Sequence, residues 1–216
     1  VPVVGPNIGI EELSPDPFEP LGNFLTYPFV IAAGENAPYD DIDGLAKHAE
    51  PNDVALGHLG APLVPTQVTF ALAKEKGFNF GSDAAFDALD CNTLASGDVD
   101  VINTTLQLIL PCLDSVKVLA SIGGERIGLT PNTPTVGELA SELDVALWNG
   151  LFVKKGVPQD ARDKIIAVAQ KVMASDAAKK LAADTGALVY WQNADDVKAQ
   201  ITKDIATMGA IGEILK

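Results

Sequence analysis

Short apolar runs of strand length alternate with helix-length segments through the first half of the chain, and this alternation restricts the fold more than any other feature. The expected strands cover residues 24–33, 53–57, 99–102 and 116–122, and the expected helices cover residues 41–50, 63–76, 87–96 and 106–113. Gly77 and Gly97 follow two of these helices, where a glycine commonly ends a helix. The alternation favours an α/β fold built from βαβ units around a parallel sheet.

The last third of the chain is richer in helices. Thr135 is the expected cap of a short helix, and an extended stretch follows over residues 146–153. An amphipathic helix is expected to open at Pro158, and further helices are expected after Ser175 and from Ala194. One face of the helix after Pro158 carries Ile165, Val168, Ala169, Val172 and Met173.

The charge of the chain excludes several classes of partner. Its 216 residues carry a formal net charge of −14, which argues against nucleic acid and against an anionic membrane surface. The longest apolar runs are strand-sized, so we expect no direct membrane insertion. The first residues lack the basic start and apolar stretch of a secretion signal, so a signal sequence is expected to be absent from this chain.

The two cysteines, Cys91 and Cys112, do not have the spacing of a metal site. Each falls within an expected helix among apolar neighbours. We therefore expect two separate, unbridged thiols, with a disulfide in an oxidising compartment as the alternative.

Catalytic chemistry has little support in the sequence. The only histidines are His48 and His58, and neither stands in a catalytic or metal-ligand spacing. His48 is expected at a solvated helix end, and Cys91 has no histidine nearby in the sequence to activate it. We therefore predict that the protein is not an enzyme, with no catalytic residues, no metal and no cofactor.

A glycine-containing turn between an expected strand and an expected helix is the best candidate for a binding site. Such a turn exposes backbone N–H groups and the positive end of a helix dipole, which suits a carboxylate or a phosphate. Between His48 and Val116 the only basic side chains are Lys74 and Lys76, so backbone groups must supply most of the attraction. The turn comprises Gly57, His58, Leu59, Gly60, Ala61, Pro62 and Leu63. The glycines could instead be purely structural, and His58 could either donate to a carboxylate or lie on the surface of the turn.

Several motifs in a fixed order carry a family resemblance. They are Asn36-Ala37-Pro38-Tyr39-Asp40-Asp41, the turn over residues 57–63, Gly77-Phe78-Asn79-Phe80 with Phe86-Asp87-Ala88, Ala95-Ser96-Gly97-Asp98-Val99-Asp100, and the segments 118–138 and 148–158. In this order they resemble the substrate-binding receptors of tripartite tricarboxylate transporters, the group that includes the TctC and Bug proteins. Single motifs of this kind are common, whereas six in one order are specific.

The resemblance implies a two-lobe α/β fold like that of periplasmic binding proteins, with a ligand cleft between the lobes. Residues 1–33 and 121–216 would form domain 1, and residues 34–120 would form domain 2. It also implies a periplasmic receptor that captures a small carboxylate for a tripartite tricarboxylate-type transporter and delivers it to membrane permease subunits. The implied ligand-binding residues are Gly57, His58, Leu59, Gly60, Ala61, Leu63, Phe86, Asp87 and Ala88.

The sequence departs from the family pattern in three places. Nothing matches the family's opening unit with its glycine-rich ligand loop, so domain 1 is expected to be incomplete at its N-terminus. Pro62 and Leu63 replace a glycine and a Ser or Thr in the turn, and Ala88 replaces a glycine in the second loop. We therefore expect this chain to bind carboxylates weakly or not at all and to expose apolar surface. It is expected either to self-associate or to have poorly ordered termini around residues 1–22. Alternative functions are a sensor or interaction protein with the same fold, or a non-binding fragment.

Overall fold

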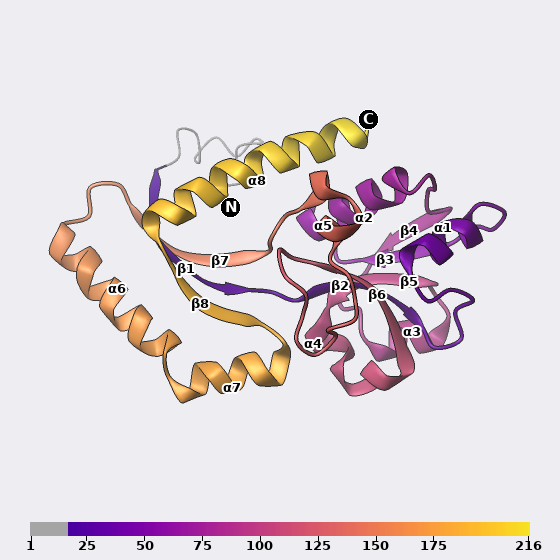
Figure 1. Cartoon of the computed structure of the whole chain (residues 1–216), viewed down its shortest axis with the longest axis horizontal. Coiled ribbons are helices and arrows are strands. Elements are labelled where there is room, and N and C mark those ends of the chain that lie inside the picture. The colour runs from indigo at the N-terminus through magenta and orange to yellow at the C-terminus, as the bar shows by residue number, and fades with distance from the viewer. Residues whose placement is uncertain (1–16) are drawn as a thin grey trace. The chain divides into compact units, whose positions relative to one another are not determined.

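The computed structural model describes residues 17–216, which form two compact units (Figure 1). Residues 17–27 and Trp148–Thr207 form unit 1, and Pro28–Leu147 with Met208–Lys216 form unit 2. No helix of the described residues is long and apolar enough to cross a bilayer. Unit 2 is thus wider than the span 34–120 expected for domain 2, because flanking segments pack into its core.

Unit 2 is an α/β sandwich around a five-stranded sheet. Its elements are β2 (Phe29–Gly34), α1 (Ile42–Ala49), β3 (Ala55–His58), α2 (Val64–Glu75), β4 (Ser82–Ala85), α3 (Cys91–Ser96), β5 (Val101–Thr105), α4 (Leu106–Ile109), the 3-10 helix η3 (Leu110–Ser115), β6 (Val116–Ile122), α5 (Val136–Leu139) and the 3-10 helix η4 (Ser141–Leu143). The strand order is β4-β3-β5-β2-β6.

The sheet of unit 2 is mixed, so the expectation of a parallel sheet is only partly correct. β3 runs parallel to β4 and β5, whereas β2 and β6 run antiparallel to their neighbours. The helical connections produce the parallel part, as expected of βαβ units. β2 instead inserts between β5 and β6, and it pairs Phe29 with both Thr105 and Ile122.

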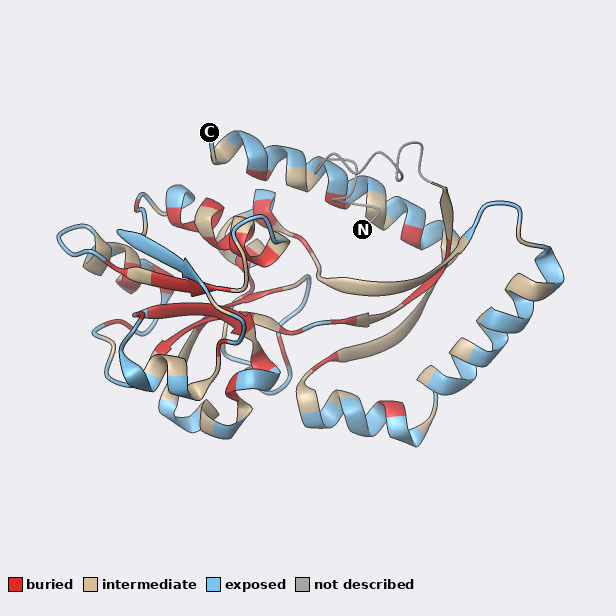
Figure 2. Cartoon of the chain, turned by 180° about the vertical axis from the view of Figure 1, so that it is seen from behind, coloured by how far each residue is buried: buried red, intermediate tan, exposed pale blue. Residues whose placement is uncertain are grey.

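The two faces of this sheet are covered by separate apolar clusters. Figure 2 shows buried residues in red along its strands. Alternation along the strands sends Ile31 and Val101 into the cluster that contains α1 and α2. Val30 and Ile102 point into the other cluster, which contains Leu106 of α4. All four strand residues are at most 1% exposed, so the sheet is a two-sided core.

Segments outside the expected domain 2 complete the first of these clusters. Val136, Leu143 and Val145 follow β6 in the chain and are buried in it. Ile211, from the last turns of the C-terminal helix, is fully buried in the same cluster. These contacts explain why unit 2 extends beyond residue 120 and includes the C-terminus.

Unit 1 has a smaller antiparallel sheet in the order β7-β1-β8. Its elements are β1 (Phe18–Thr26), β7 (Trp148–Lys154), α6 (Gln159–Met173), α7 (Asp176–Thr185), β8 (Leu188–Asn193) and the part of α8 (Ala194–Ile214) that precedes Met208. The strand expected over residues 24–33 is therefore two strands, β1 and β2. They are separated at Tyr27-Pro28, where proline has no N–H for a sheet ladder.

The apolar face of α6 is only partly covered. No residue of α6 is buried, and Val168 and Val172 are 64% and 50% exposed. With Phe24 of β1 and Leu151 of β7, these residues line an open apolar groove of about 470 Å³. The amphipathic pattern correctly predicted the helix. It did not predict that the apolar face of this helix would remain largely uncovered.

The cysteine prediction is wrong, because Cys91 and Cys112 form a disulfide with their Cα atoms 5.9 Å apart. Neither residue lies inside a long helix. Cys91 is the first residue of α3, and Cys112 has non-helical backbone angles within η3. The shorter helices bring the two positions together, and their spacing fits disulfide geometry.

Candidate functional site

The two loops expected to bind a ligand lie side by side in unit 2. They follow the carboxyl ends of β3 and β4, which are parallel neighbours with His58 opposite Ala85. The Phe86 N–H donates to the His58 carbonyl at 2.9 Å and joins the loops directly. Carboxyl ends of parallel strands are a common place for ligand sites in open α/β sheets.

The two glycines of the turn have different roles. Gly57 lies within β3 and not in the turn, contrary to the prediction. A Cβ there would come 2.9 Å from Leu89 Cδ2, so this glycine permits close packing. Gly60 lies in the turn with φ +146°, a conformation that favours glycine, and its carbonyl accepts from the Leu63 N–H at 3.1 Å.

His58 is buried at 2% exposure, so the surface position considered for it is wrong. Its Nδ1 accepts from the Gly60 N–H at 3.0 Å, which leaves the proton of a neutral ring on Nε2. Nε2 lies 2.8 Å from Asp83 Oδ2, in position to donate. Both ring nitrogens are thus used inside the protein, and His58 joins the turn to β4.

The N-terminus of α2 offers backbone donors beside the turn. Its cap residue, Leu63, makes no side-chain capping bond, and Pro65 has no N–H. The N–H groups of Val64 and Thr66 find no acceptor among residues 17–216. The Thr66 hydroxyl is also buried without a partner in this part of the chain. Such groups are commonly satisfied by an ordered water or a ligand oxygen.

The remaining loop residues divide into a core-facing and an exposed set. Leu59 and Phe86 pack against the apolar cluster on the α4 face of the sheet. Ala61, Leu63, Asp87 and Ala88 are exposed. The sequence interpretation did not include Thr66, although a threonine in the first turn of an expected helix behind a proline was a usable signal.

The charged side chains near the site are consistent with attraction of an anion by backbone N–H groups. Lys74 and Lys76 lie at the far end of α2, about 18 Å from its start at ~1.5 Å per residue, and Lys76 pairs with Asp43. Asp83 is engaged by His58, whereas Asp87 is an exposed carboxylate in the second loop. An anion would therefore depend on the α2 N-terminus, with Asp87 opposing it.

Residues 17–216 contain no group of three or more His, Cys, Asp or Glu side chains able to hold a metal. His48 is in α1 and His58 is in β3, where its ring contacts Asp83 of β4. The geometry of the loops suits recognition of an anion by N–H groups.

Several solved structures with a similar fold are solute-binding proteins. A TctC solute-binding protein from Polaromonas is 19% identical with a TM-score of 0.80, and the alignment covers 98% of this chain and 75% of that one. The periplasmic binding protein BugD is 22% identical with a TM-score of 0.74, covering 91% and 69%. MatC from Rhodopseudomonas palustris, solved with malate, is 20% identical with a TM-score of 0.73, covering 92% and 70%. The fold is thus the α/β fold of periplasmic binding proteins, as expected.

Residues 9–216 match the tripartite tricarboxylate transporter family receptor, and the chain belongs to this family. No curated protein sequence matches it. Membership confirms the family resemblance found in the motifs and places the chain among solute receptors and not among enzymes.

Proposed function

We propose that this protein is a periplasmic receptor that captures a small carboxylate and delivers it to the permease subunits of a tripartite tricarboxylate-type transporter. Unit 2 would serve as the domain 2 lobe and unit 1 as part of domain 1. Family membership supports the receptor role. The disulfide supports a periplasmic location, because disulfides persist mainly in oxidising compartments.

The observation that carries the proposal is the unpartnered α2 N-terminus beside two adjoining loops. A ligand carboxylate would accept from the N–H groups of Val64 and Thr66, either directly or through a water that also bonds the Thr66 hydroxyl. Gly60 keeps the turn clear of side-chain atoms, and His58 holds it in place. The ligand would thus be bound mainly by backbone dipoles.

The ligand class follows from the charge of the site and from the relatives. Asp87 disfavours a ligand with several negative charges gathered close to its loop. Related structures contain malate and, in another Rhodopseudomonas palustris protein with a TM-score of 0.74, adipate. We therefore propose a small dicarboxylate, with one carboxylate at α2 and the other remote from Asp87.

Isothermal titration calorimetry with malate, adipate, citrate, acetate and neutral adipamide tests the proposal. We expect a dicarboxylate to bind best and adipamide not to bind. Thr66→Val removes the buried hydroxyl at nearly constant volume and should weaken binding about tenfold. Asp87→Asn should strengthen it by a few-fold, since it removes a repulsive charge.

Thr202→Val, at an exposed position of α8, is the matched control and should leave affinity unchanged. Equal binding of adipamide and adipate would contradict carboxylate recognition. Unchanged affinity in a folded Thr66→Val variant would contradict the position of the site at the α2 N-terminus.

A further inference from the structure

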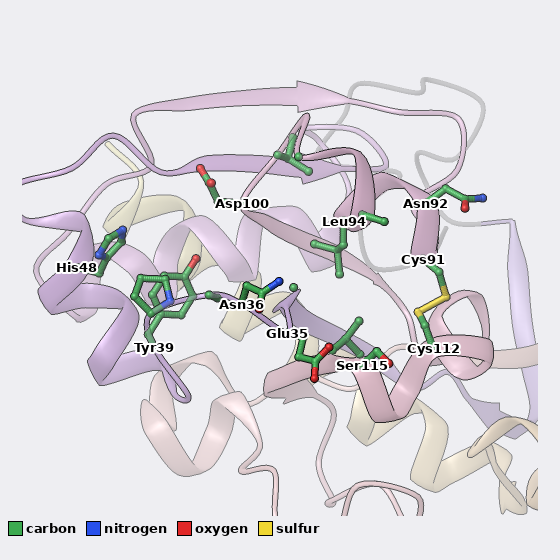
Figure 3. Close-up of a pocket in the computed structure, with 17 residues that line it drawn as sticks. Glu35, Asn36, Tyr39, His48, Cys91, Asn92, Leu94, Asp100, Cys112 and Ser115 are labelled. Carbon is green, nitrogen blue, oxygen red and sulfur yellow. A yellow bond between two sulfur atoms is a disulfide. The ribbon is translucent and has the colours of Figure 1, made fainter.

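A second pocket lies in unit 2 at the edge of the sheet opposite the candidate site (Figure 3). It has a volume of about 630 Å³, which is within the range of small-molecule sites. Its walls come from the segment after β2, the start of β5, helix α3 and the segment before β6. The pocket is at the start of β5, whereas the candidate site follows β3, whose Gly57 pairs with Ile102, so the two are roughly 10 Å apart along the strands at ~3.3 Å per residue.

Tyr39 places an unused hydroxyl at this pocket. The residue is only 4% exposed, and its hydroxyl has no hydrogen-bond partner among residues 17–216. In Figure 3 its phenol oxygen points toward the side where Asp100 lies. Burial, reinforced by the charge of Asp100, raises the pKa of Tyr39 to about 12, so the group is a neutral hydroxyl at physiological pH. A hydroxyl that faces a pocket from a buried residue is available to a ligand or an ordered water.

The electrostatic character of the pocket is negative. Glu35 and Asp100 line it, and no Lys or Arg is among its lining residues. Asp100 Oδ2 accepts from the Ala55 N–H at 2.8 Å, which fixes the carboxylate. The nearby Lys117 is engaged by Asp40 and by the Ala37 carbonyl.

The other walls of the pocket are fixed by covalent and aromatic contacts. The disulfide joins α3 to η3 at one end. The His48 ring lies 5.4 Å from that of Tyr39, centroid to centroid. His48 is in the last turn of α1, at the expected helix end, and is half-buried there. A cavity with fixed walls loses little entropy when a ligand binds.

We propose that this pocket binds a small organic cation, a primary ammonium group in particular. The ammonium would donate to the Asp100 carboxylate and to the hydroxyl oxygen of Tyr39, while the charge of Glu35, elsewhere on the pocket wall, adds to the negative potential. The alkyl part would contact Leu94, Val99 and the disulfide wall. A metal ion is a poorer fit, because no group of three or more metal-ligating side chains exists among the described residues.

The test is ligand-observed NMR titration of the full chain with n-butylammonium, 1-butanol and butyrate. Butylammonium should bind saturably, whereas the isosteric alcohol and the anion should not. Asp100→Asn retains an oxygen acceptor for the Ala55 N–H but loses the charge, and should weaken butylammonium binding about tenfold. Tyr39→Phe keeps the buried ring and should weaken binding by about threefold.

Glu125→Gln, which neutralises an exposed carboxylate outside the pocket, should bind butylammonium like the unchanged protein. Thr66→Val should also bind it normally, because the two sites are separate. Thermal melting of each variant establishes that it is folded. Equal binding of 1-butanol, no saturable binding, or full affinity in a folded Asp100→Asn variant would each overturn the proposal.

Discussion

The central strands of the unit 2 sheet are buried on both faces, whereas β7 and β8 of unit 1 contain no fully buried residue. Unit 1 relies more on directional polar contacts. Buried Asp204 accepts from the Trp148 indole N–H at 2.7 Å and from Gln200 at 2.8 Å. The same family fold thus contains one unit with a large apolar core and one with a thin core supported by hydrogen bonds.

The two units also carry different spectroscopic reporters. The chain has two tryptophans, Trp148 and Trp191, and both are in unit 1. Tryptophan fluorescence therefore follows unit 1, while far-UV circular dichroism follows both units. Urea unfolding observed by both signals tests whether the units unfold independently.

Matched leucine truncations should show the largest contrast. Leu56→Ala removes a fully buried side chain from β3, and we expect it to lower the free energy of unfolding of unit 2 by about 2–5 kcal/mol. Leu181→Ala removes a side chain of α7 in unit 1 that is 51% exposed and should cost less than about 1 kcal/mol.

In the Leu56→Ala variant the dichroism transition should move to lower urea while the fluorescence midpoint stays in place. If the two midpoints shift together, the units form one cooperative system and the contrast between their cores does not govern unfolding.

Loss of the disulfide should have the next largest effect, again on unit 2. Replacing Cys91 and Cys112 by serine opens a loop with a sequence separation of 21 and should lower the free energy of unfolding by about 3 kcal/mol. The same loss should follow from reduction of the unchanged protein. A fluorescence midpoint that moves as far as the dichroism midpoint would show that the disulfide also stabilises unit 1.

The smallest effect is expected from two salt bridges, an exposed one in unit 2 and a half-buried one in unit 1. Arg126 hydrogen-bonds Glu138 and lowers the pKa of that carboxyl from its ordinary 4.5 to about 2. Because the folded pKa lies below the unfolded one, the stabilisation is complete above pH ~4.5 and is lost as the pH falls toward 2.

Glu138→Gln should remove this pH dependence from the unit 2 transition. Arg162 likewise lowers the pKa of Glu19, so Glu19→Gln should act on the fluorescence transition of unit 1 in the same direction. Melting temperatures between pH 5 and 2 measure both effects. An unchanged pH profile in Glu138→Gln would show that the surface pair contributes nothing measurable.

Local sequence signals predicted elements well where side chains determine them. The Thr135 cap and the left-handed glycines after α2 and α3 lie where expected. β4 was not predicted, because Ser82–Ala85 is exposed at every residue and has no apolar alternation. This strand forms because its backbone pairs with β3, and its side chains follow no pattern from which a strand could be predicted.

The candidate site was likewise predicted only in part. The order of motifs predicted which two loops meet, since both follow parallel strands that pair. It did not predict that His58 is buried, because its Asp83 partner lies 25 residues away on a strand that was itself missed. The disulfide was missed for a related reason, because helix boundaries at Cys91 and Cys112 were drawn too long.

The disulfide has a mechanical consequence. The loop that it closes contains β5, the central strand of the unit 2 sheet. When the chain is pulled from its ends, residues 92–111 are shielded from the force, so complete extension of the oxidised protein falls short of the reduced one by about 70 Å at ~3.4 Å per residue. The strand at the centre of the sheet is therefore the part of unit 2 that tension on the termini does not straighten while the bond is intact.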